Sequence, residues 1–232
     1  MPQIELLHTD CMEYMRGLPD KAFELAIVDP PYGIGMDRKV GSTRKKHTQR
    51  VFHVSKEWDA AIPSAAYFAE LFRVSRHQII WGANYMTPHL PPSMGWVFWF
   101  KRLGGHFSDG EFAYTSFQRA AEMVSIWCET GDGAPARIHP TQKPVALYRW
   151  LLKNYAKPGQ RILDTHLGSG SIAIACDLEG FDLVGCEIDA DYIKAARHRL
   201  AVHQSAPRLF EATPAGLPQQ LSLGDDVLSD GT

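Results

Sequence analysis

Short apolar runs alternate with amphipathic stretches along this chain of 232 residues. The apolar or alternating runs that predict strands cover residues 4–8, 25–28, 78–81, 96–100, 111–117, 161–164 and 183–187. Residues 25–28 are apolar throughout, which is typical of a parallel strand that is covered on both faces.

The stretches between these runs predict helices over residues 11–18, 64–74, 145–155, 171–179 and 191–203. Asp10 is the expected N-cap of the first helix, because a short side-chain oxygen accepts free backbone N–H groups. Strands that alternate with helices indicate an α/β fold with a doubly wound, mostly parallel sheet.

The chain reads as one catalytic domain over residues 1–204, followed by a flexible tail over 205–232 that is rich in Pro, Gly, Ser and acids. Residues 33–57 lack periodicity and form a long basic loop, and the pattern is also weak over 118–137. Loops of such length are usually functional or disordered.

Composition excludes several classes of protein. There is no apolar run long enough for a membrane span, and the four cysteines form no CxxC pair. The ten histidines show no metal-binding spacing, so no metal is expected. Free thiols and the lack of a secretion signal indicate a cytoplasmic protein.

The net charge is only −2, but positive charge is concentrated in the basic loop. Between residues 37 and 56 there are seven Lys or Arg against one acid. A solvated loop is the plain alternative, but the loop directly follows the motif described next, which favours contact with DNA phosphates. The residues expected to bind DNA are Arg38, Lys39, Arg44, Lys45, Lys46 and Arg50.

The strand over 25–28 ends in Asp29-Pro30-Pro31-Tyr32. A carboxylate, a free carbonyl and an aromatic ring at one sheet edge can hold a flat base and accept the N–H groups of its amine. The same tetrapeptide also marks an ordinary exit from a strand into a turn. Alone, it leaves both interpretations open.

A second constellation follows the strand over 161–164. The turn Gly168-Ser169-Gly170 opens a helix, and Glu187 ends the next strand, where an acid typically binds ribose hydroxyls. The turn lacks the third glycine of GxGxxG and the lysine of a P-loop, so it favours a cofactor with a ribose but no phosphate. S-adenosylmethionine fits this description; a structural turn with a surface acid is the alternative.

Together, Asp29–Tyr32, the segment His139-Pro-Thr-Gln-Lys-Pro144, and residues 163–171 with Glu187 resemble the β-class adenine-N6 DNA methyltransferases. The catalytic motif precedes the cofactor motif, as it does in that class. The resemblance covers about residues 4–203. It implies a class I methyltransferase-like (Rossmann-like) fold with a seven-stranded sheet, one strand of which is antiparallel.

The resemblance also implies roles for residues. Asp29, Pro30, Pro31 and Tyr32 would be catalytic, with Tyr32 stacking on a flipped-out base. Asp10 and Cys11 would lie at the adenine of the cofactor, while the His139–Lys143 segment would close over its methionine carboxylate. The cofactor-binding set is Asp10, Cys11, Asp29, His139, Thr141, Gln142, Lys143, Asp164, His166, Gly168, Ser169, Gly170, Glu187, Ile188 and Asp189. The family commonly has Asp-Pro-Phe where this chain has Asp164-Thr165-His166.

The expected function is methyl transfer from S-adenosylmethionine to N6 of adenine in duplex DNA. An aspartate at the first motif position favours adenine, because cytosine-N4 enzymes more often have a serine there. A cytosine-N4 or RNA methyltransferase and an inactive nucleic-acid-binding scaffold are the alternatives. Residues 118–137 would recognise the target. A homodimer and a restriction endonuclease are the expected protein partners, and no membrane association is expected.

Overall fold

The computed structural model describes residues 2–35, 59–102, 108–128, 138–139 and 141–206. Its centre is one eight-stranded sheet in the order β1-β8-β7-β2-β3-β5-β4-β6. The strands are β1 (Ile4–His8), β2 (Phe23–Val28), β3 (Ser75–Trp81), β4 (Trp96–Phe100), β5 (Gly110–Thr115), β6 (Glu122–Ser125), β7 (Arg161–Asp164) and β8 (Asp182–Glu187). Only β5 runs antiparallel to its neighbours among these strands.

The sheet therefore has one strand more than the seven that were expected. The additional strand is β6, which pairs in parallel with the outer side of β4. It lies in the weakly patterned region over 118–137. Of its four residues only Val124 is buried, so the strand has no apolar pattern that the sequence could reveal.

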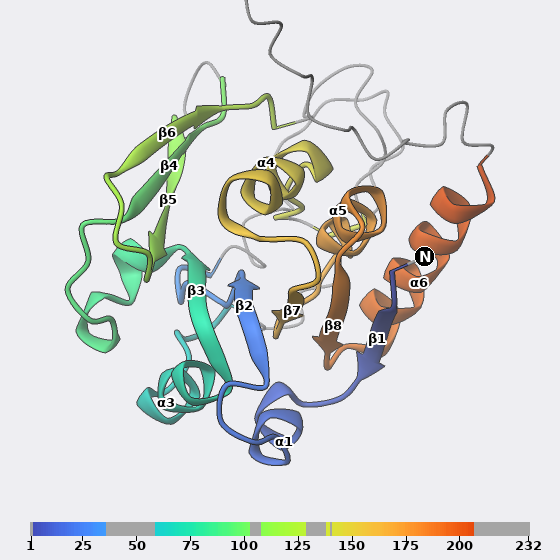
Figure 1. Ribbon diagram of the computed structural model, residues 1–232, viewed down its shortest axis with the longest axis horizontal. Helices are drawn as coiled ribbons and strands as arrows, with labels where there is room; N and C mark the ends of the chain where they lie inside the picture. The colour runs from blue at the N-terminus through green and yellow to red at the C-terminus, as the bar shows by residue number, and fades with distance from the viewer. Residues whose placement is uncertain (1, 36–58, 103–107, 129–137, 140, 207–232) are drawn as a thin grey trace, which may run out of the picture.

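Helices cover both faces of the sheet (Figure 1). Helices α1 (Cys11–Arg16) and α3 (Ala65–Val74) lie on one face, and α4 (Val145–Tyr155), α5 (Ser171–Glu179) and α6 (Ala190–Ser205) lie on the other. Two 3₁₀ turns, η1 (Ala83–Tyr85) and η2 (Thr87–His89), follow β3. The doubly wound α/β fold is thus confirmed. No described helix has the length and apolar character of a membrane span.

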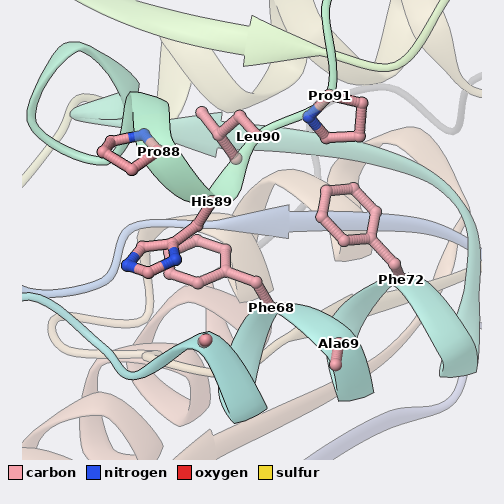
Figure 2. A pocket seen from close by; sticks show the side chains of 8 residues that line it. Phe68, Ala69, Phe72, Pro88, His89, Leu90 and Pro91 are labelled. Carbon is pink, nitrogen blue, oxygen red and sulfur yellow. The ribbon is translucent and has the colours of Figure 1, made fainter.

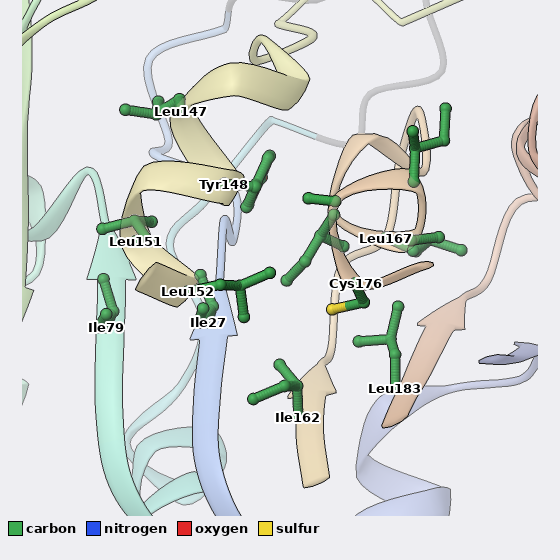
Figure 3. Close-up of a cluster of buried hydrophobic side chains, with 14 of the residues drawn as sticks. Ile27, Ile79, Leu147, Tyr148, Leu151, Leu152, Ile162, Leu167, Cys176 and Leu183 are labelled. Carbon is green, nitrogen blue, oxygen red and sulfur yellow. The ribbon is translucent and has the colours of Figure 1, made fainter. Parts of the chain in front are cut away.

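The apolar run of β2 is buried on both faces of the sheet. Leu25 and Ile27 point to the face of α4 and α5, while Ala26 and Val28 point to the face of α1 and α3. Figure 3 shows Ile27 among apolar side chains of α4 and of the neighbouring strands. Because side chains alternate along a strand, a stretch that is covered on both faces buries every side chain and is therefore mostly apolar.

Candidate active site

Three acids meet at one edge of the sheet. Asp29 directly follows β2, while Asp164 ends β7 and Glu187 ends β8. Strand β7 pairs in parallel with both β2 and β8, so the carboxyl ends of all three strands lie at the same edge. In open α/β sheets this edge is where ligands bind.

Asp29 is held at both of its carboxylate oxygens. The Tyr32 hydroxyl donates to Oδ1 over 2.6 Å, and the Lys143 ammonium lies 2.5 Å from Oδ2. Burial raises the pKa of Asp29, and the charge of Lys143 partly opposes this effect. A carboxylate has about four lone-pair positions, so Asp29 keeps acceptor capacity for a further donor.

Lys143 lies between two carboxylates. Its ammonium contacts Asp29, lies 3.1 Å from Oε2 of Glu111, and donates to the Tyr32 hydroxyl. The side chain is 2% exposed, so its charge must be compensated by nearby acids. In this structure the carboxylates of Asp29 and Glu111 provide that compensation.

The ring of Tyr32 packs against the segment that follows β3. It stacks on Tyr85 with 5.5 Å between centroids and 19° between planes. The ring also lies against Gly82, where an added Cβ atom would overlap it. Stacking of Tyr32 on a flipped base stays a prediction; here the ring packs on Tyr85 and its hydroxyl binds Asp29.

Asp59 shapes the turn after Asp29, and the sequence reading missed it. Its Oδ1 accepts the backbone N–H groups of Tyr32 and Gly33 over 2.7 and 2.8 Å. Asp59 is buried, as is Pro30 within the turn. No local signal marks this aspartate, because 27 residues separate it from Tyr32 and the basic loop lies between them.

The glycine turn closes around Glu187. The carboxylate accepts from Gly168 N over 2.8 Å and from Asp189 N over 2.9 Å. Gly168 and Gly170 have positive φ angles of 51° and 70°, which L side chains rarely adopt. Burial raises the pKa of Glu187, while the two backbone donors oppose the shift. Ile188 beside it is exposed.

The segment before α4 covers this turn. The imidazole of His139 packs next to Gly168 and contacts the Tyr192 ring edge-on. Thr141 Oγ1 lies 3.1 Å from His139 Nδ1, and Gln142 Oε1 accepts the N–H of Ile138. The structure therefore brings His139 and Thr141 to the glycine turn.

A polar network is present at Thr165 and His166, where the chain departs from the family that its motifs resemble. The hydroxyls of Tyr67 and Thr165 are 2.7 Å apart, and Thr165 Oγ1 lies 2.9 Å from His166 Nδ1. Burial lowers the pKa of His166 to about 4, so the imidazole is neutral at pH 7. Burial also raises the pKa of Asp164 to about 8. Tyr67 lies 98 residues from Thr165, so the sequence did not reveal this contact.

At the start of α1, the cap was predicted correctly. Asp10 Oδ1 accepts from Met12 N over 2.6 Å and from Glu13 N over 3.2 Å. Burial raises the pKa of the adjacent Cys11 thiol to about 12, with the charge of Asp10 adding to the shift. Cys11 is therefore a neutral thiol near the end of β1.

Several predicted site residues lie outside the described part of the chain. They are Arg38, Lys39, Arg44, Lys45, Lys46 and Arg50 of the basic loop. Residues 129–137 of the predicted recognition region and 207–232 of the tail also lie outside it.

Figure 2 shows a separate apolar groove between α3 and η2. Its lining consists of Ala65, Phe68, Ala69, Phe72, Pro88, His89, Leu90 and Pro91. None of these residues belongs to the site described above, so the groove plays no part in the chemistry considered below.

The chain is similar in sequence to known methylases. A family model described as DNA methylase matches residues 101–198. YubD of Escherichia coli (strain K12), which is named as a suggested methylase, is 26% identical over 85% of this chain and 90% of its own length. The type II methyltransferase M.HpaI of Haemophilus parainfluenzae is 22% identical over 84% of this chain and 73% of its own.

Two solved structures show the same fold. The M1.HpyAVI–SAM complex superimposes with a TM-score of 0.53 and 19% identity, and the match covers 85% of this chain and 99% of that one. The cytosine-N4-specific PvuII DNA methyltransferase superimposes with a TM-score of 0.58 and 10% identity, and the match covers 91% of this chain and 89% of that one. The fold is therefore that of the class I methyltransferases.

Proposed function

We propose that this chain, which carries a DNA methylase domain of the N6/N4 type over residues 101–198, methylates N6 of adenine in duplex DNA. The observation that carries the proposal is the position of Asp29. Its carboxylate lies at the same sheet edge as the glycine turn and Glu187. An acceptor for an amine and a site for a methyl donor are thus adjacent.

The chain's residues fit S-adenosylmethionine as the donor. Glu187 already binds two backbone N–H groups, so its carboxylate is fixed at the strand end where ribose hydroxyls are bound in this fold. Gly168 lets the backbone come close to the ligand, with His139 beside it. The M1.HpyAVI structure contains this cofactor in the same fold. When bound, it supplies an electrophilic methyl group, which the amine nitrogen takes while a neutral thioether departs and the amine loses one proton.

Asp29 and the Pro30 carbonyl prepare the amine. The lone pair of an exocyclic amine is shared with the base ring, which makes the nitrogen a poor nucleophile. Acceptance of both N–H bonds orients that lone pair and stabilises the positive charge that develops on nitrogen. Tyr32 and Lys143 fix the carboxylate in place, so little reorganisation is needed. Holding the amine and the methyl group in line supplies much of the remaining acceleration.

Cytosine-N4 is the second candidate target. The PvuII enzyme, which has the same fold, is named as cytosine-N4-specific. The two amines are chemically similar, and both would fit between a carboxylate and a carbonyl. Asp29 favours adenine, because the cytosine-N4 enzymes more often have a serine at the first position of this motif.

Recognition of DNA is assigned to the basic loop and to residues 118–137. Lys and Arg of the loop would bind phosphates, which fixes the register without reading sequence. A homodimer is proposed because residues 118–137 make a short recognition region for one copy. A restriction endonuclease partner is proposed from the similarity to M.HpaI, which is named as a type II methyltransferase.

The variant Asp29→Asn tests the role of the carboxylate. We expect the rate of transfer of labelled methyl from S-adenosylmethionine to unmethylated DNA to fall by about 100-fold or more, because a preorganised charge is lost. Calorimetry should show cofactor affinity within about threefold of the original, since ribose binding depends on Glu187.

The matched control is Asp182→Asn, at the start of β8 on the opposite edge of the same sheet. This aspartate accepts the backbone N–H of Gln3 and should leave the transfer rate unchanged. Full activity of Asp29→Asn, or loss of its cofactor binding, would show that Asp29 has another role.

A further inference from the structure

We propose that Glu111 is a positioning residue for methyl transfer, because it shares the Lys143 ammonium with Asp29 and so preserves Asp29 as a strong acceptor. The inference rests on the proposed function. It concerns a residue that lies outside every motif on which that function was based.

The arrangement consists of two acids and two lysines. The Lys143 ammonium lies 2.5 Å from Asp29 Oδ2 and 3.1 Å from Glu111 Oε2. The other oxygen of Glu111, Oε1, lies 2.5 Å from Lys101 Nζ. Lys143 therefore bridges the two carboxylates, and Lys101 binds Glu111 on its far side.

The topology of the sheet brings Glu111 to the active edge. Strand β5 is antiparallel to β3, so the first residues of β5 lie near the carboxyl end of β3. Ala113 pairs with Trp81, the last residue of β3, and Glu111 precedes Ala113 by two positions. A parallel strand in this place would present its carboxyl end here instead.

The charges explain what Glu111 does to Asp29. A lysine bound by one acid neutralises that acid strongly, whereas a lysine held between two acids leaves each of them more of its negative charge. The pKa of Asp29 is raised first by burial; Lys143 lowers it and Glu111 raises it again. For Glu111, burial is outweighed by Lys143 and Lys101, which lower its pKa to about 2. Glu111 is thus ionised throughout the working pH range.

Other titratable groups also face Asp29. They come from the turn after β2, from β5, from the start of α4 and from β7, and are Tyr32, Glu111, Lys143, Tyr148 and Asp164. Of these, only Glu111 combines a permanent negative charge with a direct contact to Lys143. Without Glu111, the charge of Lys143 would act on Asp29 alone. The removal of Glu111 should therefore lower the proton affinity of Asp29.

The variant Glu111→Gln tests this, and two measurements are needed. The single-turnover rate of methyl transfer to DNA should fall about tenfold or more, and the acid limb of its pH profile should move to lower pH. In NMR titration of ¹³C-labelled aspartate carboxyl groups, the Asp29 signal, identified by its absence in Asp29→Asn, should also titrate at lower pH. Cofactor affinity should not change.

Glu179→Gln is the matched control. Glu179 also binds two cations, since Arg149 donates to Oε1 over 2.5 Å and Lys153 lies 3.4 Å from it. It lies at the end of α5, outside the site, so its loss should reduce stability without changing the pH profile. If Glu111→Gln fails to fold, Glu111→Asp is the second variant. Its shorter side chain places the carboxylate farther from Lys143, so the acid limb and the Asp29 signal should move to lower pH by a smaller amount.

An unchanged rate with an unmoved acid limb, or a shift of the Asp29 signal to higher pH, would overturn the inference. A rate loss without any shift of the Asp29 signal would also overturn it, because that result describes a structural role. Failure of the unmodified protein to methylate DNA would contradict the proposed function instead. The NMR titration of Asp29 would still decide the role of Glu111 in that case.

Discussion

At the scale of single residues, the site consists of buried and half-buried acids whose charges are compensated to different degrees. Asp29 has Tyr32 and Lys143 as partners, and Glu187 has two backbone donors. Within the described part of the chain, the Asp164 side chain accepts only the backbone N–H of His166, and burial raises its pKa to about 8. Its neutral form is thus favoured in the folded protein without ligand.

This property predicts how stability depends on pH. In the unfolded chain, Asp164 has the ordinary pKa of 3.8, and folding raises it, so the folded state binds the extra proton between pH 3.8 and about 8. Relative to Asp164→Asn, the original protein should lose about 1.4 kcal/mol of unfolding free energy per pH unit as pH rises through this window. Urea unfolding of both proteins at several pH values measures the difference. Parallel curves would contradict the raised pKa.

Asp29 and Glu187 could be found from the sequence because each ends an apolar run, and the ends of parallel strands converge. Glu111 and Asp59 could not, because nothing in their local sequence shows which distant group they contact. Tyr32 and Glu111 are 79 residues apart. The sequence singled out Lys143, but it does not show that a carboxylate of β5 lies beside it.

At the scale of elements, the turn after β2 is the part that depends most on a distant residue. The carboxylate of Asp59 accepts the backbone N–H groups of Tyr32 and Gly33. This turn places Pro30 and Tyr32 at the edge of the sheet. Its shape is therefore set from outside the Asp-Pro-Pro-Tyr motif.

Asp59→Ala should destabilise the protein by about 2–4 kcal/mol, because two hydrogen bonds to a charged acceptor are lost. Transfer activity should fall even at temperatures where the variant is fully folded. Asp59→Asn, which keeps an oxygen acceptor, should recover much of both. Thermal unfolding and the transfer rate measure the effects; an Asp59→Ala variant with full stability would contradict this account of the turn.

The elements themselves were largely predictable. Seven strands and five helices follow from the apolar periods, because central strands and packed helices have long and consistent patterns. Strand β6 was missed because its four residues are held by pairing with β4 and by the hydrogen bond that the Tyr155 hydroxyl donates to Glu122. Such tertiary contacts leave no local period.

At the scale of the whole molecule, the order of the strands makes the site. Strand β2 lies between β7 and β3, so the Asp29–Tyr32 motif near the start of the chain comes to the same edge as the glycine turn that follows β7. The antiparallel β5 adds Glu111 to the same edge. Three distant segments of sequence thus form one place where an amine and a methyl donor can meet.

The identity of the methylated base tests the central claim most directly. Unmethylated DNA is incubated with the full-length protein and S-adenosylmethionine carrying a labelled methyl group, and the DNA is then digested to nucleosides for mass spectrometry. The account predicts label in N6-methyladenine and none with the Asp29→Asn variant. Label in N4-methylcytosine, or DNA without label, would contradict it.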